Sequence, residues 1–468
     1  MQVSVKPEVS YLEKLLKESC KGVSSTVPWE FPLDLKMATW LQQVRDHAAT
    51  WVRELSIPTR RDEEWRFTNL SSMMKLGFQA PAPVDLDALD IAPFILPEAV
   101  DSRLVFVNGV FAPQLSSLTG IENQIFVGNL GQLPTQYQKR ISNYLAQQPG
   151  SQEVFTSLNT AGLTDTAVVW LPKNQMVKNP IHLLFIAAQT KIPILTQRRC
   201  LVVAESNSSA KIVEHCVSAE VMYPEAPTSQ PYLTNAVTEI WVEENAEINY
   251  TRVQEDAGEA FHIGKTAIAQ AKNSRYTCNA IHLGAKLSRH NLEVTQMGES
   301  TETNLYGLAF IGNKQEADTH SSIILNHPHG ITDQIYKSIV DDKAHSVFNG
   351  KVYVSQAAQL TNAAQLNRNL LLSSDGRIDT KPQLEIIADN VQCSHGATVS
   401  QLDDDEIFYL QSRGLNEEVS RNLLIDAFAT EIINKLPLPS LQHILKQCVA
   451  CKVDQEERRK AQEDVLKS

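Results

Sequence analysis

The chain has 468 residues, of which 43% are hydrophobic and 21% charged, and its formal net charge is −12. This composition is typical of a folded protein and excludes wholesale disorder, and the length predicts two or three domains. The excess of carboxylates argues against a nucleic-acid partner, because binding to nucleic acid depends on a basic surface.

Residues 1–100 are predicted to form an N-terminal helical domain with a linker. Apolar residues recur at helical spacing in Tyr11–Ser19 and in Leu35–Leu55, as they do on the buried stripe of a helix. Prolines bound both segments, as expected at helix ends. The Pro- and Ala-rich stretch Ala80–Pro97 is interpreted as a linker with helical fragments.

Residues 101–410 change to the alternation of β-strands, as in Ala236–Val242 and Ile263–Ala269. Small polar turns separate the strands, and from Lys272 to Asn313 they recur about every 12–14 residues, a spacing typical of stacked architectures. The pattern predicts a mainly β protein with a β-helix core. A Greek-key sandwich is the alternative, but a body of about 300 residues is too large for one sandwich.

Residues 411–468 are predicted to form a C-terminal helical domain. Asn416 suits a helix N-cap, and two glutamates follow it, where carboxylates meet the positive end of the helix dipole. Leu424, Phe428 and Ile432 lie on one apolar stripe of this helix. Because the end coils of a solenoid expose unpaired strand edges, we expect the terminal helices to cap both ends.

The compartment is predicted from the N-terminus and the cysteines. The first ten residues contain no apolar stretch like that of a secretory signal. Apolar runs such as Leu183–Ala188 are far too short to cross a bilayer, so no membrane partner is expected. Seven scattered cysteines do not form a disulfide framework. These features predict a cytoplasmic protein.

The segment Cys393–Thr398 contains the richest local set of reactive side chains. Residues two apart on a strand share a face, so Cys393 and His395 are expected to project together. A thiolate and an imidazole suit iron and sulfur chemistry, but two ligands cannot complete a site. Since Val391 and Val399 have the same parity, packing on the inner face is the alternative interpretation.

Other motifs favour structural roles. Cys448 and Cys451 form a CxxC pair without a second pair at zinc spacing, so helix packing is favoured. The histidines of His327–His329 flank a proline and are interpreted as a loop pair rather than a metal site. His282 and His290 bracket a turn and are expected at the surface. No P-loop sequence is present, so no ATP site is expected in this chain.

Three blocks, in this order, resemble the SufB/SufD family of iron–sulfur cluster assembly proteins. Pro58–Thr68 resembles the Pro-Thr…Glu…Trp segment near the start of the family, and His320–Val354 resembles its His…Phe-x-Gly block. Pro382–Leu415, which contains Cys-Ser-His-Gly-Ala-Thr, is the most specific match. The resemblance implies a right-handed parallel β-helix between helical terminal domains. It also implies a complex with a SufB-like paralogue and a SufC-like ATPase, in which this chain is a non-catalytic scaffold or adaptor subunit.

The resemblance is greater to the SufD side of the family than to the SufB side. Gly396 stands where SufB-like chains have a glutamate, and the turn Ser374–Asp379 lacks the cysteine expected of SufB. The resemblance implies that His395, and to a smaller extent Cys393, hold iron or a nascent cluster that is shared transiently with SufB.

The resemblance also implies a place for the ATPase: SufC is expected to dock on the stripe formed by Leu424, Phe428 and Ile432. In isolation, the chain is compatible with a homodimer. Two other functions are alternatives to this one. A polysaccharide lyase or hydrolase, which β-helices often host, needs a long groove of clustered acidic and basic residues that the sequence does not show. A purely structural adaptor with no metal role stays open.

Overall fold

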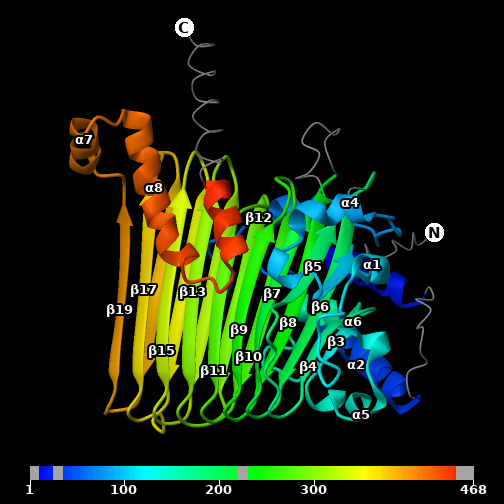
Figure 1. The fold of residues 1–468 in the computed structure, drawn as a ribbon. Helices are drawn as coiled ribbons and strands as arrows, with labels where there is room; N and C mark the ends of the chain where they lie inside the picture. Colours follow the sequence, from blue (N-terminus) through cyan, green and yellow to red (C-terminus); the bar gives the residue numbers. More distant parts are fainter. Residues whose placement is uncertain (1–9, 25–34, 189, 220–229, 450–468) are drawn as a thin grey trace, which may run out of the picture.

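The computed structural model describes residues 10–24, 35–188, 190–219 and 230–449. Strands pack into two sheets, which we call sheet A and sheet B (Figure 1). Sheet A has the order β18-β16-β14-β12-β10-β8-β6-β4-β3, and sheet B has the order β19-β17-β15-β13-β11-β9-β7-β5-β1-β2. Successive strands therefore alternate between the sheets, which is the topology of a solenoid.

The strands are β1 (Arg103–Val107), β2 (Val110–Phe111), β3 (Phe126–Asn129), β4 (Ala167–Leu171), β5 (Ile181–Ala187), β6 (Ile194–Ala204), β7 (Ser209–Ser218), β8 (Tyr232–Val242), β9 (Glu247–Glu255), β10 (Phe261–Gln270), β11 (Arg275–His282), β12 (Leu287–Gln296), β13 (Glu302–Ile311), β14 (Glu316–Leu325), β15 (Ile331–Val340), β16 (His345–Val354), β17 (Asn362–Leu371), β18 (Arg377–Ile386) and β19 (Gln392–Ser400). The α-helices are α1 (Tyr11–Ser24), α2 (Leu35–Glu54), α3 (Ser71–Met74), α4 (Ala88–Ile91), α5 (Thr135–Gln138), α6 (Val154–Ala161), α7 (Asp404–Ser412) and α8 (Glu417–Ile433), and residues 439–449 are also helical.

Each coil of the solenoid contains one strand of each sheet, and coils stack in parallel. Leu287 pairs with Glu316 and Glu316 with His345, so these coils repeat every 29 residues. The spacing between turns that the sequence predicts is thus the length of half a coil. The predicted β-helix is confirmed. The inward-facing side chains form an apolar core along one side of the interior, with Ile240, Ile248 and Val352 among its members.

Asparagines shape one edge of the solenoid. Asn207, Asn245 and Asn273 occupy successive turns with φ of 59°, 58° and 56°, a left-handed region that asparagine tolerates better than most side chains. Their carboxamides bond from turn to turn: Asn245 Nδ2 donates to Asn207 Oδ1, and Asn273 Nδ2 to Asn245 Oδ1, each at 3.1 Å. This ladder explains why small polar turns recur in the sequence.

The helices cover the faces of the solenoid more than its ends. α1, α2 and α6 pack on the outer face of sheet A, where Leu15 and Phe155 meet Leu233 and Phe261. α8 and the helical stretch 439–449 pack on the outer face of sheet B, against Phe310 and its neighbours. The expected capping by C-terminal helices is therefore wrong for the last coil. The physical reason is that each outer sheet face is itself apolar and has to be covered.

The two ends of the solenoid differ. At the first end, the short antiparallel strands β2 and β3 pair with β1 and β4. At the other end, β18 and β19 are the outermost strands of their sheets, and α7 lies beyond β19 (Figure 1). Among the described residues, none of the helices is both long and apolar enough to cross a membrane.

Candidate functional site

The last coil is an open edge. β18 pairs with β16, and β19 pairs with β17, but neither has a further strand beside it in the described part of the chain. Most residues of β19 are exposed, in contrast to the nearly continuous burial of β10. A row of unpaired backbone N–H and C=O groups is a template for another strand. This end of the molecule can therefore accept a partner by strand addition.

Cys393 and His395 both lie on β19 with the parity that faces the interior. Cys393 pairs with Ala363 and His395 with Gln365 of the preceding coil, and both of these partners are buried. Cys393 is half-buried against the apolar core, whereas His395 is exposed because no coil follows. Packing on the inner face therefore describes the Cys393 thiol in part, but it does not describe the His395 imidazole.

His395 lies at the end of a row of polar side chains that continues into the interior of the solenoid. Gln365 Nε2 donates to Gln334 Oε1 at 2.8 Å, and Gln334 Nε2 donates to Ser321 Oγ at 2.5 Å. These amides are buried, so their hydrogen bonds fix their orientation. The imidazole of His395 is the exposed end of this row of polar side chains, at the open edge.

The chemistry of the pair is that of an incomplete ligand set. Burial raises the pKa of the Cys393 thiol, which keeps it protonated and weakens it as a ligand near neutral pH. No group of three or more His, Cys, Asp or Glu side chains in the described ranges is arranged to hold a metal ion. If iron or a cluster binds here, its remaining ligands have to come from another chain.

The three predicted docking residues of α8 occupy different environments. Ile432 is fully buried against sheet B, and Phe428 is half-buried with the Lys337 ammonium over its ring at 4.1 Å. Leu424 is half-buried, and the neighbouring Leu423 is 47% exposed. Since a buried side chain cannot contact a partner, Ile432 acts by holding α8 in place.

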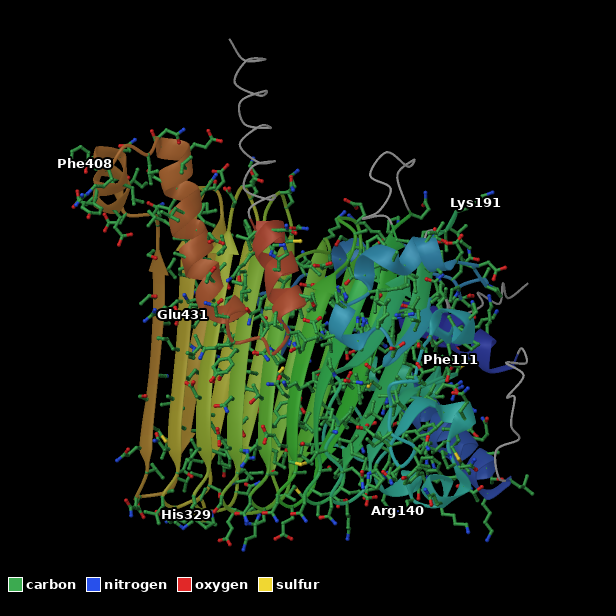
Figure 2. All side chains as sticks on the ribbon, viewed as in Figure 1. Phe111, Arg140, Lys191, His329, Phe408 and Glu431 are labelled. Carbon is green, nitrogen blue, oxygen red and sulfur yellow. The ribbon has the colours of Figure 1, made fainter. Side chains whose placement is uncertain are left out.

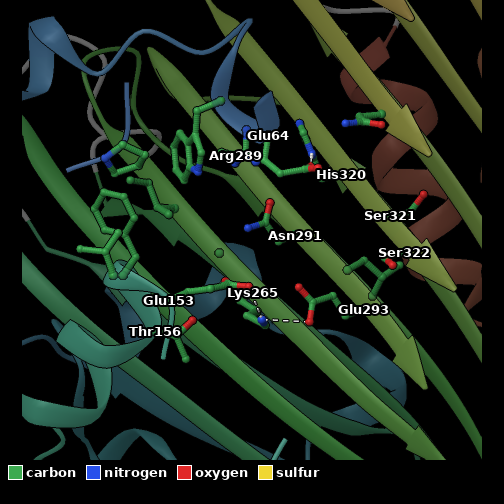
Figure 3. Close-up of a pocket in the computed structure, with 18 of the residues that line it drawn as sticks. Glu64, Glu153, Thr156, Lys265, Arg289, Asn291, Glu293, His320, Ser321 and Ser322 are labelled. Atoms are coloured by element: carbon green, nitrogen blue, oxygen red, sulfur yellow. Dashed lines mark hydrogen bonds and ion pairs between the residues drawn. The ribbon is translucent and has the colours of Figure 1, made fainter. Parts of the chain in front are cut away.

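A cleft of about 620 Å³ lies on the outer face of sheet A. The segment Pro58–Thr68, which was singled out in the sequence, forms one wall of it together with the start of α6, and the strands of sheet A from β8 to β18 form its floor (Figure 3). Figure 3 shows Glu64 close to His320, and Gln383 of the third block also lines the cleft, so all three sequence blocks meet there. The ring of Trp65 stacks on Arg289, whose Cζ is 3.9 Å from the ring centroid.

The charged groups at the cleft are paired with one another. Lys265 Nζ lies 3.0 Å from Glu153 and 2.9 Å from Glu293 (Figure 3). Arg289 pairs with Asp318, which is fully buried, and Arg289 together with His320 holds the pKa of that carboxyl well below its usual range despite burial. The cleft is therefore a place of balanced charge with a partly aromatic wall.

The interior contains polar residues that sequence reasoning missed. His282 and His290, expected at the surface, are buried, and their rings lie 5.7 Å apart inside the solenoid. That expectation was wrong because both residues lie on strands, with inward parity, rather than in the turn between them. Burial lowers the pKa of both imidazoles well below its usual value, so they are neutral.

The remaining motifs are placed as follows. His327 and His329 lie in a turn, as expected, and His329 has the left-handed φ of 61° (Figure 2). Cys448 lies on the helical stretch 439–449, whereas Cys451 lies outside the described residues, so the CxxC prediction is not tested. Cys200 and Cys278 are buried, as expected of small apolar side chains.

Two family models match the chain. Residues 185–428 match the model described as "SUF system FeS cluster assembly, SufBD core domain", and residues 32–183 match the "SufBD protein N-terminal region". An iron–sulfur cluster assembly SufBD family protein of Synechocystis is 52% identical over 87% of this chain and 90% of its own length. The iron–sulfur cluster assembly protein SufD of Escherichia coli is 31% identical over 84% of this chain and 88% of its own length.

The matched core model covers more than half of the chain, from β5 to α8, and the N-terminal model covers the elements from α2 to β4. This agrees with the resemblance carried by the three sequence blocks and with the β-helix fold. The chain therefore belongs to the SufB/SufD family of SUF iron–sulfur cluster assembly proteins.

Proposed function

We propose that this chain is a scaffold and adaptor subunit that pairs with a SufB-like paralogue and a SufC-like ATPase to build nascent iron–sulfur clusters, and that it assists iron entry. The observation that carries the proposal is the open last coil, where His395 is exposed and Cys393 is half-buried at an unpaired strand edge. Exposed apolar residues at the same end, such as Ile387 and Val399, favour a protein partner.

The pair is proposed as a half-site. This chain offers an imidazole and a thiol, and the partner completes the ligand set with its own side chains. Iron in clusters is usually held by thiolates, and histidine is a known substitute. His395 is the stronger of the two ligands in this proposal, because it is exposed and because the burial that raises the pKa of Cys393 disfavours its thiolate.

The test compares three variants of β19 in a complex reconstituted with SufB-like and SufC-like partners under anaerobic conditions. His395→Ala is expected to leave complex yield unchanged and to lower the iron and the visible absorbance per complex. Cys393→Ser is expected to have a smaller effect. Ser394→Ala is the matched control, since Ser394 lies between them with the opposite parity.

A purely structural adaptor is the second candidate, and the half-burial of Cys393 against the core favours it. On that account, His395→Ala changes neither iron content nor absorbance per complex, and Cys393→Ser lowers the melting temperature. Iron content and complex yield measured on the same preparation distinguish the two functions.

A further inference from the structure

The segment Pro58–Thr68, here called the strap, is held against sheet A mainly by polar contacts. Most of its residues are exposed, from Thr59 to Glu64 without interruption. Its neighbours on either side are firmly anchored, because Val52 of α2 and Leu70 are both buried in the apolar cluster on sheet A. The strap therefore spans two fixed points, and its position depends on the contacts in between.

Those contacts are made to side chains of three strands and to Phe155 of α6, whose ring centroid lies 5.6 Å from that of Trp65. The hydroxyl of Thr68 donates a short hydrogen bond to the Asp318 carboxylate of β14. Glu63 pairs with Lys381 of β18 at 2.9 Å, and Trp65 lies over Arg289 of β12. A further contact joins Glu64 to His320, at the rim of the cleft (Figure 3).

His320 has a carboxylate at each ring nitrogen. Its Nε2 lies 2.9 Å from Asp318 Oδ1, and its Nδ1 lies 3.2 Å from Glu64 Oε2. A neutral imidazole donates from only one nitrogen, whereas an imidazolium donates from both. The two contacts are therefore satisfied together only when His320 is protonated. Without the proton, one carboxylate faces a nitrogen lone pair and is repelled.

We propose that His320 is a protonation-dependent clasp that holds the strap closed over the cleft on sheet A. As an imidazolium it bridges Asp318 of the sheet and Glu64 of the strap. When the proton leaves, Glu64 loses its partner and the middle of the strap lifts, which opens the cleft of about 620 Å³. This device is independent of the function proposed for the last coil.

The charges around His320 fix the direction of the pH dependence. Burial, with a smaller effect of Arg289, disfavours the imidazolium, but Asp318 and Glu64 together outweigh them and raise the pKa of His320. A base whose pKa is raised on folding stabilises the closed form fully below its unfolded value of about 6.5. That stabilisation is lost as pH rises through the higher value of the closed form. The strap is therefore closed in mild acid and loosens as pH rises through that higher value.

Glu316 is a second titrating group beside the strap. Its effect on the pH dependence has to be distinguished from that of His320. Burial, and then repulsion by Asp318, raise the pKa of its carboxyl to about 7. The backbone N–H of Asn69 donates to this carboxyl. An acid whose pKa is raised destabilises the folded form as pH rises from its unfolded value toward about 7. Glu316 thus acts in the same direction as His320, over a lower pH range.

The test is amide hydrogen exchange of the strap in the full-length chain at pH 6 and pH 8.5, after correction for the intrinsic pH dependence of exchange. In the unmodified protein, strap protection is expected to fall severalfold at the higher pH while the core strands stay protected. His320→Gln and Glu64→Gln are each expected to give low protection that no longer changes with pH. Glu316→Gln is expected to keep the fall above neutrality.

His345→Gln is the matched control, because His345 lies on the same outer face and pairs with Asp379 of β18 at 2.7 Å. It is expected to keep the full pH response of the strap. The proposal is overturned if strap protection in the unmodified protein changes by less than about twofold, the scale of about 0.4 kcal/mol. It is equally overturned if Glu64→Gln, whose side chain is 68% exposed and whose loss leaves the core intact, retains the normal response.

Discussion

Glu214 is a charged residue that is almost completely buried. It lies inside the solenoid on β7, 2.9 Å from Arg198 and 3.5 Å from Arg252, and it accepts hydrogen bonds from Tyr250 and Thr238. Burial opposes its ionisation, but the two guanidinium groups and the two hydroxyls lower its pKa to about 2. The carboxylate is therefore compensated on every side.

Removing this carboxylate leaves two buried guanidinium groups without their nearest counter-charge. We expect Glu214→Ala to lower the free energy of unfolding by about 3–5 kcal/mol. Glu247→Ala removes the partner of Arg275 in an exposed pair and is expected to cost at most about 1 kcal/mol. Urea denaturation of both variants measures the difference, and equal losses would contradict the buried-charge account.

The lowered pKa of Glu214 also predicts how the stability of the protein changes in acid. Because folding lowers the pKa of Glu214 from 4.5 to about 2, its stabilisation is complete above the unfolded value and is lost as pH falls toward 2. The unmodified protein is expected to lose stability more steeply than Glu214→Ala between about pH 4.5 and 2. Thermal melts across that range test the sign, and parallel curves for the two proteins would exclude it.

The helix α8 was predictable in position but not in orientation. Its N-cap is as expected, since Asn416 Oδ1 accepts from the Val419 N–H at 2.8 Å. The residues that face sheet B are Ile425, Ala429 and Ile432, which overlap the predicted stripe only at its end. A helix with apolar residues on more than one face does not reveal, by its spacing alone, which of them is buried.

This division of α8 predicts two different effects. Leu423→Asp, on the exposed side, is expected to weaken binding of a SufC-like ATPase by about tenfold or more without shifting the melting temperature, as for an interface residue worth about 1.4 kcal/mol. Ile432→Ala is expected to cost about 2–5 kcal/mol of stability and to leave binding by the folded protein unchanged. Titration calorimetry and thermal melts separate them. A loss of affinity in Ile432→Ala alone would mean that the predicted stripe, rather than the exposed flank, is the contact.

Across the whole molecule, the sequence predicts the stacked β body and the helical termini, because turn chemistry and strand period are local properties. It does not predict which residues are interior. Strands such as β10 are buried on both faces, since helices cover sheet A outside and the core lies inside, so the alternation that marks one face is lost. The cleft under Pro58–Thr68 was also not predictable, because it joins residues more than 200 positions apart in the sequence.

The open last coil has a consequence for the isolated chain, because an uncovered strand edge tends to pair with another copy. We expect the protein without partners to form a homodimer through β18 and β19. Val399→Lys places a charge at this edge and is expected to shift the protein to monomer. Ile331→Lys is the control, because Ile331 has the same exposed fraction of 51% on β15, away from the edge, and it is expected to leave the dimer intact. Sedimentation velocity over a concentration series measures both. A chain that stays monomeric at every concentration, or a dimer that survives Val399→Lys but not Ile331→Lys, would show that the edge is not the self-association surface.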